Sequence, residues 1–262
     1  MTCSNATYDE EDLRATADDK RSSYFGGKGG AGTYQTIINM IPPHEIYIET
    51  HLGGGAIMRH KKMAAVSIGI DVDPWVVDSW RPHSRDITLR NVDATRWLQG
   101  EGSFYRRYKN KVFIYCDPPY LPETLKSRPR YNFNMGHQAH IKLLAVLKKL
   151  PCNVMISGYW SDLYAVTLKN WRAVSFESMT RRGKATEWVW MNYPEPTELH
   201  DYRYLGRDFR ERERIRRKRE RWVRRLQEMP QLERMAMVST INKIDEHRSA
   251  PFTASGDGKE QS

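Results

Sequence analysis

Short apolar runs rich in β-branched and aromatic residues recur along the middle of the chain, separated by polar or helical stretches. Most of these runs are continuous rather than alternating, which is typical of parallel strands covered on both faces. One helix, beginning near Gly136 and ending at Pro151, joins two of the runs as a crossover connection. The predicted strands are Glu45–Glu49, Ala65–Ile70, Ile87–Val92, Val112–Cys116, Asn153–Ser157, Ala173–Glu177 and Glu187–Asn192. The pattern predicts an open, doubly wound α/β sheet that binds its ligands at the carboxyl ends of the strands.

The sequence around this region predicts three further segments. Residues 1–20 are polar and acidic and are expected to be disordered, and so is the tail 248–262. We expect a catalytic domain over 21–196 and a basic helical extension over 197–247. No apolar run approaches the roughly 18 residues of a membrane span, and the first residues lack the apolar stretch of a signal peptide. Three widely spaced cysteines fit free thiols, so a cytoplasmic protein is expected.

Positive charge is concentrated at one place. Twelve basic and five acidic residues lie between His200 and Arg225, so this segment carries seven of the ten net positive charges of the chain. A helix is predicted from Gly206 to Glu228, with Ile215, Trp222 and Leu226 on one narrow apolar stripe. A solvated helix docked by that stripe is one interpretation, and phosphate contact is the other. The candidate phosphate contacts are Arg216, Arg217, Arg219 and Arg221.

Two loops at predicted strand ends indicate a cofactor that contains adenosine. The strand ending at Glu49 is followed by three consecutive glycines, Gly53, Gly54 and Gly55, which permit a tight turn and close approach of a ligand to the backbone. The next strand ends at Asp71, about 20 residues later, where a carboxylate accepts hydrogen bonds from ribose hydroxyls in nucleotide-binding sheets. The spacing leaves a dinucleotide and S-adenosylmethionine both open at this point.

A third loop, Asp117-Pro118-Pro119-Tyr120, directly follows the fourth predicted strand. Its two prolines fix φ and remove two backbone donors, so the loop is rigid and offers carbonyl oxygens. An exocyclic amine is a poor nucleophile because its lone pair is delocalised into the ring. Hydrogen bonds from the amine to Asp117 and to the Pro118 carbonyl would localise that lone pair, while Tyr120 stacks on the base. The loop therefore predicts methylation of an amino group on a base.

These residues resemble the Dam-like family of DNA adenine methyltransferases, whose fold is a Rossmann-like methyltransferase sheet. The matching segments are Tyr24-Phe25-Gly26-Gly27-Lys28, Glu49 with the three glycines, Asp71, and Asp117–Tyr120, within a stretch from Tyr24 to Pro194. Tyr131, Met135 and His140 are similar to the family's segment after the catalytic loop, and Glu187, Asn192 and Tyr193 to its last-strand signature. The resemblance implies a DNA partner and S-adenosylmethionine as the cofactor. It implies a cofactor site of Tyr24, Gly27, Lys28, Glu49, Gly53, Gly54, Gly55, Asp71, Asp93 and Asp117, and catalysis by Asp117, Pro118, Pro119 and Tyr120.

The chain departs from the family at two places. Thr50 and His51 follow the glutamate, where the family has proline and an aromatic residue. The interval from Asp73 to Asp117 has room for little beyond one strand, so it lacks the family's inserted target-recognition domain. We therefore expect weak sequence selectivity and binding mainly through phosphates. Within Leu121–Asn134, the residues Lys126, Arg128, Arg130 and Tyr131 are candidates to hold a DNA strand from which the adenine has been rotated out.

Other functions stay open. Methylation of adenine in RNA needs the same loop chemistry, and a non-catalytic nucleic-acid-binding protein of this fold is a rival from another class. The intact Lys28, Asp71 and Asp117 oppose that rival. A protein-amine or glutamine methyltransferase is disfavoured because similar enzymes carry asparagine in place of Asp117. His137 and His140 lack a nearby third ligand, so no metal site is assigned, and Cys116 is interpreted as a buried strand residue.

Overall fold

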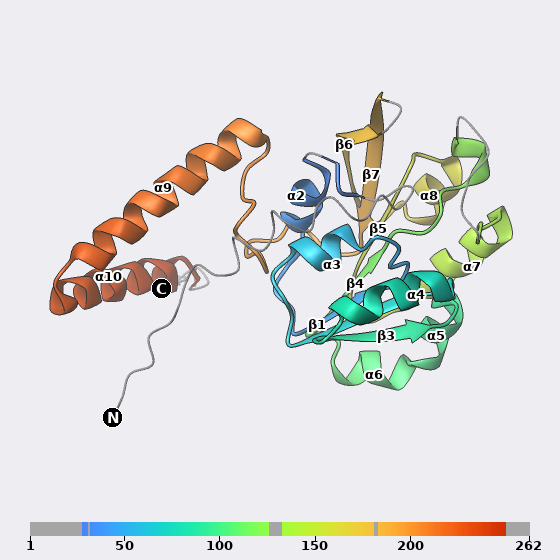
Figure 1. Cartoon of the computed structure of the whole chain (residues 1–262), viewed down its shortest axis with the longest axis horizontal. Helices are drawn as coiled ribbons and strands as arrows, with labels where there is room; N and C mark the ends of the chain where they lie inside the picture. The colour runs from blue at the N-terminus through green and yellow to red at the C-terminus, as the bar shows by residue number, and fades with distance from the viewer. Residues whose placement is uncertain (1–27, 31, 126–132, 181–182, 250–262) are drawn as a thin grey trace, which may run out of the picture. The chain divides into compact units, whose positions relative to one another are not determined.

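A computed structural model describes residues 28–30, 32–125, 133–180 and 183–249 of the chain (Figure 1). The chain divides into two compact units, one ending at Phe209 and one beginning at Arg210. The described helices and strands of the first unit are α2 (Thr33–Ile38), β1 (Ile46–Glu49), α3 (Ala56–His60), β2 (Val66–Asp71), α4 (Pro74–Trp80), the 3₁₀ helix η1 (Arg81–His83), β3 (Ile87–Asn91), α5 (Ala94–Gly100), α6 (Gly102–Arg107), β4 (Val112–Cys116), the 3₁₀ helix η2 (Pro122–Thr124), α7 (His137–Leu147), β5 (Asn153–Gly158), α8 (Asp162–Thr167), β6 (Arg172–Thr180) and β7 (Gly183–Met191).

The seven strands form one sheet in the order β3-β2-β1-β4-β5-β7-β6. Strands β1 to β5 are parallel to their neighbours, and β7 pairs antiparallel with both β5 and β6. This arrangement confirms the predicted α/β fold with an open, doubly wound, Rossmann-like sheet. The strand order reverses between β1 and β4, where Glu49 pairs with Tyr115. The loops after these two strands, which carry the glycines and Asp117, therefore leave the sheet side by side.

The continuous apolar strands are buried on both faces, as their sequence predicts. Odd-numbered side chains such as Tyr47, Tyr115 and Met155 form one core with α2, α3 and α4. Even-numbered side chains such as Ile48 and Ile114 form the other core, with α5, α6 and α7. Side chains alternate along a strand, so Glu49 and Asp117 belong to the face of α2 and α3.

The antiparallel β7 brings its first half to the carboxyl end of the parallel strands. Trp188 pairs with Gly158, the last residue of β5, and Met191 pairs with Met155. Because β7 runs the other way, Glu187 lies at the edge of the sheet where β4 and β5 end. A carboxylate from the last strand of the domain is thereby placed beside Asp117, a neighbour that strand order alone does not reveal.

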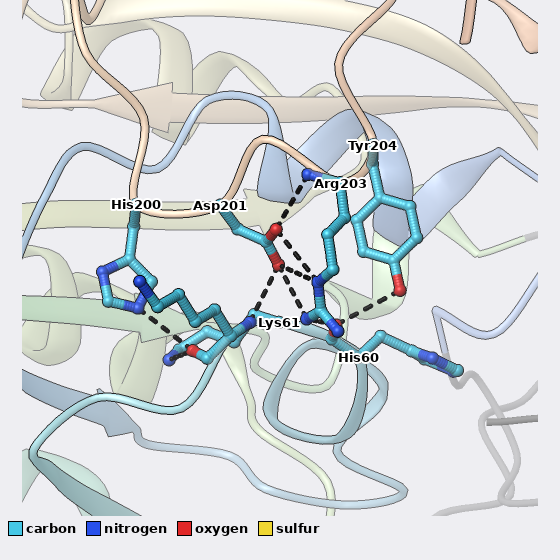
Figure 2. Close-up of polar contacts among 7 residues, drawn as sticks. His60, Lys61, His200, Asp201, Arg203 and Tyr204 are labelled. Atoms are coloured by element: carbon cyan, nitrogen blue, oxygen red, sulfur yellow. Dashed lines mark hydrogen bonds and ion pairs between the residues drawn. The ribbon is translucent and has the colours of Figure 1, made fainter. Parts of the chain in front are cut away.

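A segment after the sheet, His200–Tyr204, binds the end of α3 and is named here the C-terminal clamp (Figure 2). Asp201 is buried, and its carboxylate accepts hydrogen bonds from the Lys62 backbone N–H (2.8 Å) and from the Arg203 guanidinium Nη2 (2.8 Å). The same Nη2 donates to the carbonyl of His60 (2.8 Å). These bonds satisfy polar backbone groups where α3 ends. The segment directly following Pro196 is thus attached to the sheet domain by buried charge-assisted hydrogen bonds.

The second unit consists of α9 (Phe209–Glu228) and α10 (Gln231–Ser249). The predicted basic helix is present and begins three residues later than expected. None of the residues of α9 is buried. Ile215 and Leu226 of the expected apolar stripe are half-buried, whereas Trp222 is exposed. Arg216, Arg217, Arg219 and Arg221 are all exposed, and Arg216 pairs with Glu213 at 2.7 Å.

Candidate functional site

The glycine loop between β1 and α3 has a backbone that only glycine accommodates well. Gly53 and Gly55 have φ values of 44° and 57°, in the left-handed region. A Cβ atom at Gly55 would lie 2.2 Å from the ring of Trp80, so this position excludes every other residue. The indole Nε1–H of Trp80 in turn donates to the Gly53 carbonyl at 2.9 Å. The loop is therefore held in one shape by α4 before any ligand binds.

Asp71 joins the glycine loop to the loop after β2. Its Oδ2 accepts from the Gly53 backbone N–H and its Oδ1 from the Asp73 backbone N–H, both at 2.9 Å. Burial raises the pKa of Asp71, and these backbone donors oppose that rise. Each carboxylate oxygen keeps a further lone pair, so the bonds to the backbone and the predicted bonds to ribose are compatible. Asp71 thus organises both loops around the place expected for the cofactor.

Lys28 lies buried between two carboxylates at the carboxyl end of the sheet. Its Nζ is 2.9 Å from Oδ1 of Asp117 and 3.0 Å from Oε1 of Glu187, and it also contacts the Tyr120 hydroxyl. The Tyr120 hydroxyl donates to Oε1 of Glu187 at 2.6 Å. Lys28, Asp117, Tyr120 and Glu187 form what we call the charge cluster. It connects the segment before α2, the loop after β4 and strand β7.

The electrostatics of the charge cluster keep the lysine charged. Burial lowers the pKa of Lys28, but Asp117 and Glu187 outweigh burial and raise it above its usual value. Burial raises the pKa of Glu187, while the charge of Lys28 opposes that rise. Burial, followed by the negative charge of Glu187, raises the pKa of Tyr120 well above its normal range. The tyrosine therefore stays a neutral hydrogen-bond donor rather than a phenolate.

Asp117 is oriented from the neighbouring strand as well. Ser157, on β5, donates from its Oγ to Oδ1 of Asp117 at 2.9 Å, and its Oγ lies 2.9 Å from the buried Tyr115 hydroxyl. Among the residues that the structure describes, the bonds from Lys28 and Ser157 both engage Oδ1 of Asp117 rather than Oδ2. Ser157 was not among the predicted site residues. Ser157 is the last residue of a predicted strand, and that strand pairs with the strand before Asp117. The expectation that ligands bind at the carboxyl ends of the strands therefore also indicates Ser157.

Glu49, at the end of β1, is buried and lies close to this cluster. The Tyr47 hydroxyl donates to its Oε2 at 2.8 Å. Burial raises the pKa of Glu49 to about 8. Nearby, burial lowers the pKa of Lys61 to about 7, and its Nζ lies 4.2 Å from the centre of the Tyr47 ring. At neutral pH, the proton on Glu49 makes it a donor as well as an acceptor.

Other predicted residues have mainly structural contacts. Asp93 is exposed and caps α5 by accepting from the Arg96 backbone N–H at 2.8 Å. His140 is buried, with its Nδ1 2.9 Å from the Tyr164 hydroxyl. Asn192 donates to the Cys152 carbonyl and accepts from the Val154 N–H, and the Tyr193 hydroxyl donates to the Met40 carbonyl. Among the residues that the structure describes, no group of three or more His, Cys, Asp or Glu side chains is placed to hold a metal ion.

Cys116 is fully buried, and burial raises the pKa of its thiol to about 12. A thiol of this kind is a poor nucleophile, in agreement with its interpretation as a strand residue.

Six predicted site residues lie outside the described residues, so their predicted roles stay predictions: Tyr24, Gly27, Lys126, Arg128, Arg130 and Tyr131. None of the described helices combines the length and apolar character needed to cross a membrane.

Comparisons with known proteins give similarity to solved structures only. No protein-family model and no curated protein matches the chain. A methyltransferase from Agrobacterium tumefaciens, described as S-adenosylmethionine-dependent, aligns at a TM-score of 0.41 and 12% identity, over 61% of this chain and 60% of that one. A putative methyltransferase from Streptococcus mutans, solved with S-adenosylhomocysteine, aligns at 0.41 and 10% identity, over 60% and 93%. A putative RNA methyltransferase from Pyrococcus horikoshii aligns at 0.40 and 10% identity, over 64% and 84%. The chain thus spans less than two thirds of the Agrobacterium protein.

The buried carboxyl of Glu49 predicts a specific pH dependence of stability. Its folded pKa lies above the usual value of 4.5, so its contribution is full below that pH and is lost as pH rises through about 8. Glu49→Gln cannot ionise, so we expect it to gain at least about 1 kcal/mol relative to the wild type between pH 5 and pH 9. Urea unfolding of both proteins without cofactor measures this difference. A pH-independent difference for Glu49→Gln contradicts the assignment.

Proposed function

We propose that this protein transfers a methyl group from S-adenosylmethionine to the exocyclic amino group of adenine in DNA. The observation that carries the proposal is the charge cluster, in which Lys28 and Ser157 fix Asp117 at the carboxyl edge of the sheet. The glycine loop and Asp71 lie at that same edge, after the adjacent strands β1 and β2. The proposed cofactor site and the proposed amine-binding carboxylate are thereby adjacent.

The residues at this edge fit S-adenosylmethionine. The left-handed conformations of Gly53 and Gly55 shape the turn of the glycine loop, and Asp71 has lone pairs for ribose hydroxyls. The Glu49 carboxyl is suited to the polar methionine end of the cofactor, and Asp93 to the adenine end. When bound, the cofactor supplies a methyl group on a positively charged sulfur.

The chain's own groups prepare the amine for attack. Oδ2 of Asp117 and the Pro118 carbonyl accept the two amine hydrogens, which localises the nitrogen lone pair. Lys28 and Ser157 hold the carboxylate rigidly, so little reorganisation accompanies the reaction. Tyr120 offers its ring to one face of the base, while its hydroxyl is fixed by Glu187. The amine loses its proton to water after the methyl group arrives, so no general base is required.

Adenine in RNA is the alternative substrate. The Asp73–Asp117 interval contains only α4, η1, β3, α5, α6 and β4, which form part of the sheet domain. The absence of a separate target-recognition domain in this interval is the observation that favours RNA over a sequence-specific DNA site. The exposed arginines of α9 suit phosphates of either polymer.

Asp117→Ala is expected to lower the rate of methyl transfer by about 10²- to 10³-fold, which is the usual effect of losing one oriented electrostatic contact. The fold and binding of S-adenosylmethionine should largely survive, because the glycine loop and Asp71 do not depend on this carboxylate. Turnover with labelled cofactor and isothermal titration calorimetry measure the two properties. Asp86→Ala, which removes an exposed carboxylate before β3, serves as the matched control and should keep full activity. Wild-type turnover in Asp117→Ala would falsify the catalytic assignment.

Removal of α9 and α10 by truncation after Asp208 should weaken DNA binding and flatten its salt dependence. Each phosphate contact that is lost lowers the log–log slope by roughly 0.9 on duplex DNA. Fluorescence anisotropy at several salt concentrations gives the slope, and cofactor binding should not change. Truncation after Pro196 is the informative comparison, because it also removes the C-terminal clamp and should lower the free energy of unfolding. An unchanged slope after truncation at Asp208 contradicts a phosphate-binding role for the helices.

A further inference from the structure

An aromatic surface lies beside the charge cluster, on the loop that follows β5. Cys116 of β4 pairs with Ile156 of β5, so Tyr159 and Trp160 leave the sheet alongside the loop Asp117–Tyr120. The ring centres of Tyr159 and Tyr120 are 4.5 Å apart in an edge-to-face arrangement. Trp160 comes next in the chain and is 48% exposed. A large aromatic side chain is thus presented to solvent within one residue of a ring that contacts the proposed catalytic loop.

The Trp160 ring is supported rather than loosely attached to the surface. Its centre lies 4.6 Å from that of Trp188 and 6.4 Å from that of Trp190, which is buried on β7. The next residue, Ser161, is buried and caps α8 by accepting from the Tyr164 N–H. The backbone is therefore fixed on both sides of Trp160. An indole held in this way loses little conformational entropy when a flat ligand stacks on its open face.

Trp160 and Tyr120 contact adjacent residues of β7. Tyr120 bonds to Glu187, on the face of the sheet covered by α2 and α3, and Trp160 packs on Trp188, whose side chain points to the other face. The two rings thus engage β7 side chains that point to opposite faces of the sheet, so a base stacked on Trp160 is a different base from one stacked on Tyr120. The target base occupies the Tyr120 side, so a base on the Trp160 side must be a neighbour of the target.

We infer that Trp160, supported by Trp188, is a stacking site for a nucleobase adjacent to the methylated adenine. This inference rests on the proposed function. When the target adenine is rotated out of its stack, the neighbouring base loses a stacking partner. The exposed indole replaces that partner, and it does so without reading the identity of the base, because every base has a π-face. Such a site fits a protein without a target-recognition domain.

A double-mutant cycle between protein and oligonucleotide tests this site. The probe is a single-stranded oligodeoxynucleotide with one adenine among thymines, and a second version carries abasic sites on both sides of the adenine. Affinities are measured by fluorescence anisotropy in the presence of S-adenosylhomocysteine. For the wild type, the abasic flanks should weaken binding by on the order of tenfold, the value of one stacked base. Trp160→Ala should bind the intact strand about tenfold more weakly and should no longer distinguish the two strands.

Three further variants separate stacking from stability. Trp160→Leu keeps an apolar contact with Trp188 but has no planar face, so it should behave like Trp160→Ala. Trp160→Phe should regain most of the discrimination. Val166→Ala, which removes an exposed apolar side chain from α8, should match the wild type. Equal discrimination by the wild type, Trp160→Ala and Trp160→Leu, or no discrimination by the wild type, overturns the proposal.

The outcome is independent of the test of function. If the protein methylates adenine but the losses of affinity from Trp160→Ala and from the abasic flanks are additive, the proposed function holds and the stacking site is wrong. If the protein transfers no methyl group but the two losses are not additive, the proposed function is wrong and the base contact holds. The same cycle with a ribo-oligonucleotide identifies the source of the base, because tighter binding and equal discrimination with RNA would assign the site to an RNA strand.

Discussion

The arrangement of the candidate site depends on one buried cation. Lys28 lies between Asp117 and Glu187 and ties together three segments far apart in the sequence. Two carboxylates this close repel each other in a low-dielectric environment unless a positive charge lies between them. Loss of Lys28 would leave the buried carboxylate of Glu187 and the partly buried carboxylate of Asp117 poorly compensated, a costly state for a folded protein. The same ion pairs that stabilise the cluster also fix the orientation of Asp117, so stability and the proposed positioning of the substrate have one physical origin.

Residues from the strands on either side of β4 surround this cation and fix the positions of its partners. Ser157 approaches Asp117 from β5, Glu187 approaches from the antiparallel β7, and Glu49 lies at the end of β1. On the other side of β1, Asp71 and Trp80 fix the glycine loop through its backbone. The C-terminal clamp then binds the end of α3, the helix that begins directly after that loop. The loops that bear the candidate site residues are therefore held by bonds to regular elements as well as by the bonds of Lys28 to the loop after β4.

Much of this organisation is predictable from the sequence because the parallel strands read as continuous apolar runs. Such runs locate the strand ends, and the strand ends locate Asp71 and Asp117. The pairing of Lys28 with Glu187 is not predictable in the same way, since it depends on the insertion of β7 between β5 and β6. The C-terminal clamp is not predictable from the sequence for a different reason. Asp201 and Arg203 begin a run of charged residues that favours a solvated helix, and only their contacts with Lys62 and His60 distinguish them from the arginines that follow. Trp160 belongs to no recognisable sequence motif. Its exposure to solvent and its packing against Trp188 are properties of the folded chain that the sequence does not predict.

The central claim is that the Lys28–Asp117 pair presents a carboxylate to the amino group of adenine in DNA. The most direct measurement incubates the protein with labelled S-adenosylmethionine and a mixed pool of DNA and RNA, digests both polymers to nucleosides, and identifies the labelled species by mass spectrometry. We expect the label in N6-methyl-2′-deoxyadenosine. Label confined to N6-methyladenosine from RNA would assign the same chemistry to the alternative substrate, and label in another nucleoside, or in none, would contradict methylation of adenine by this protein.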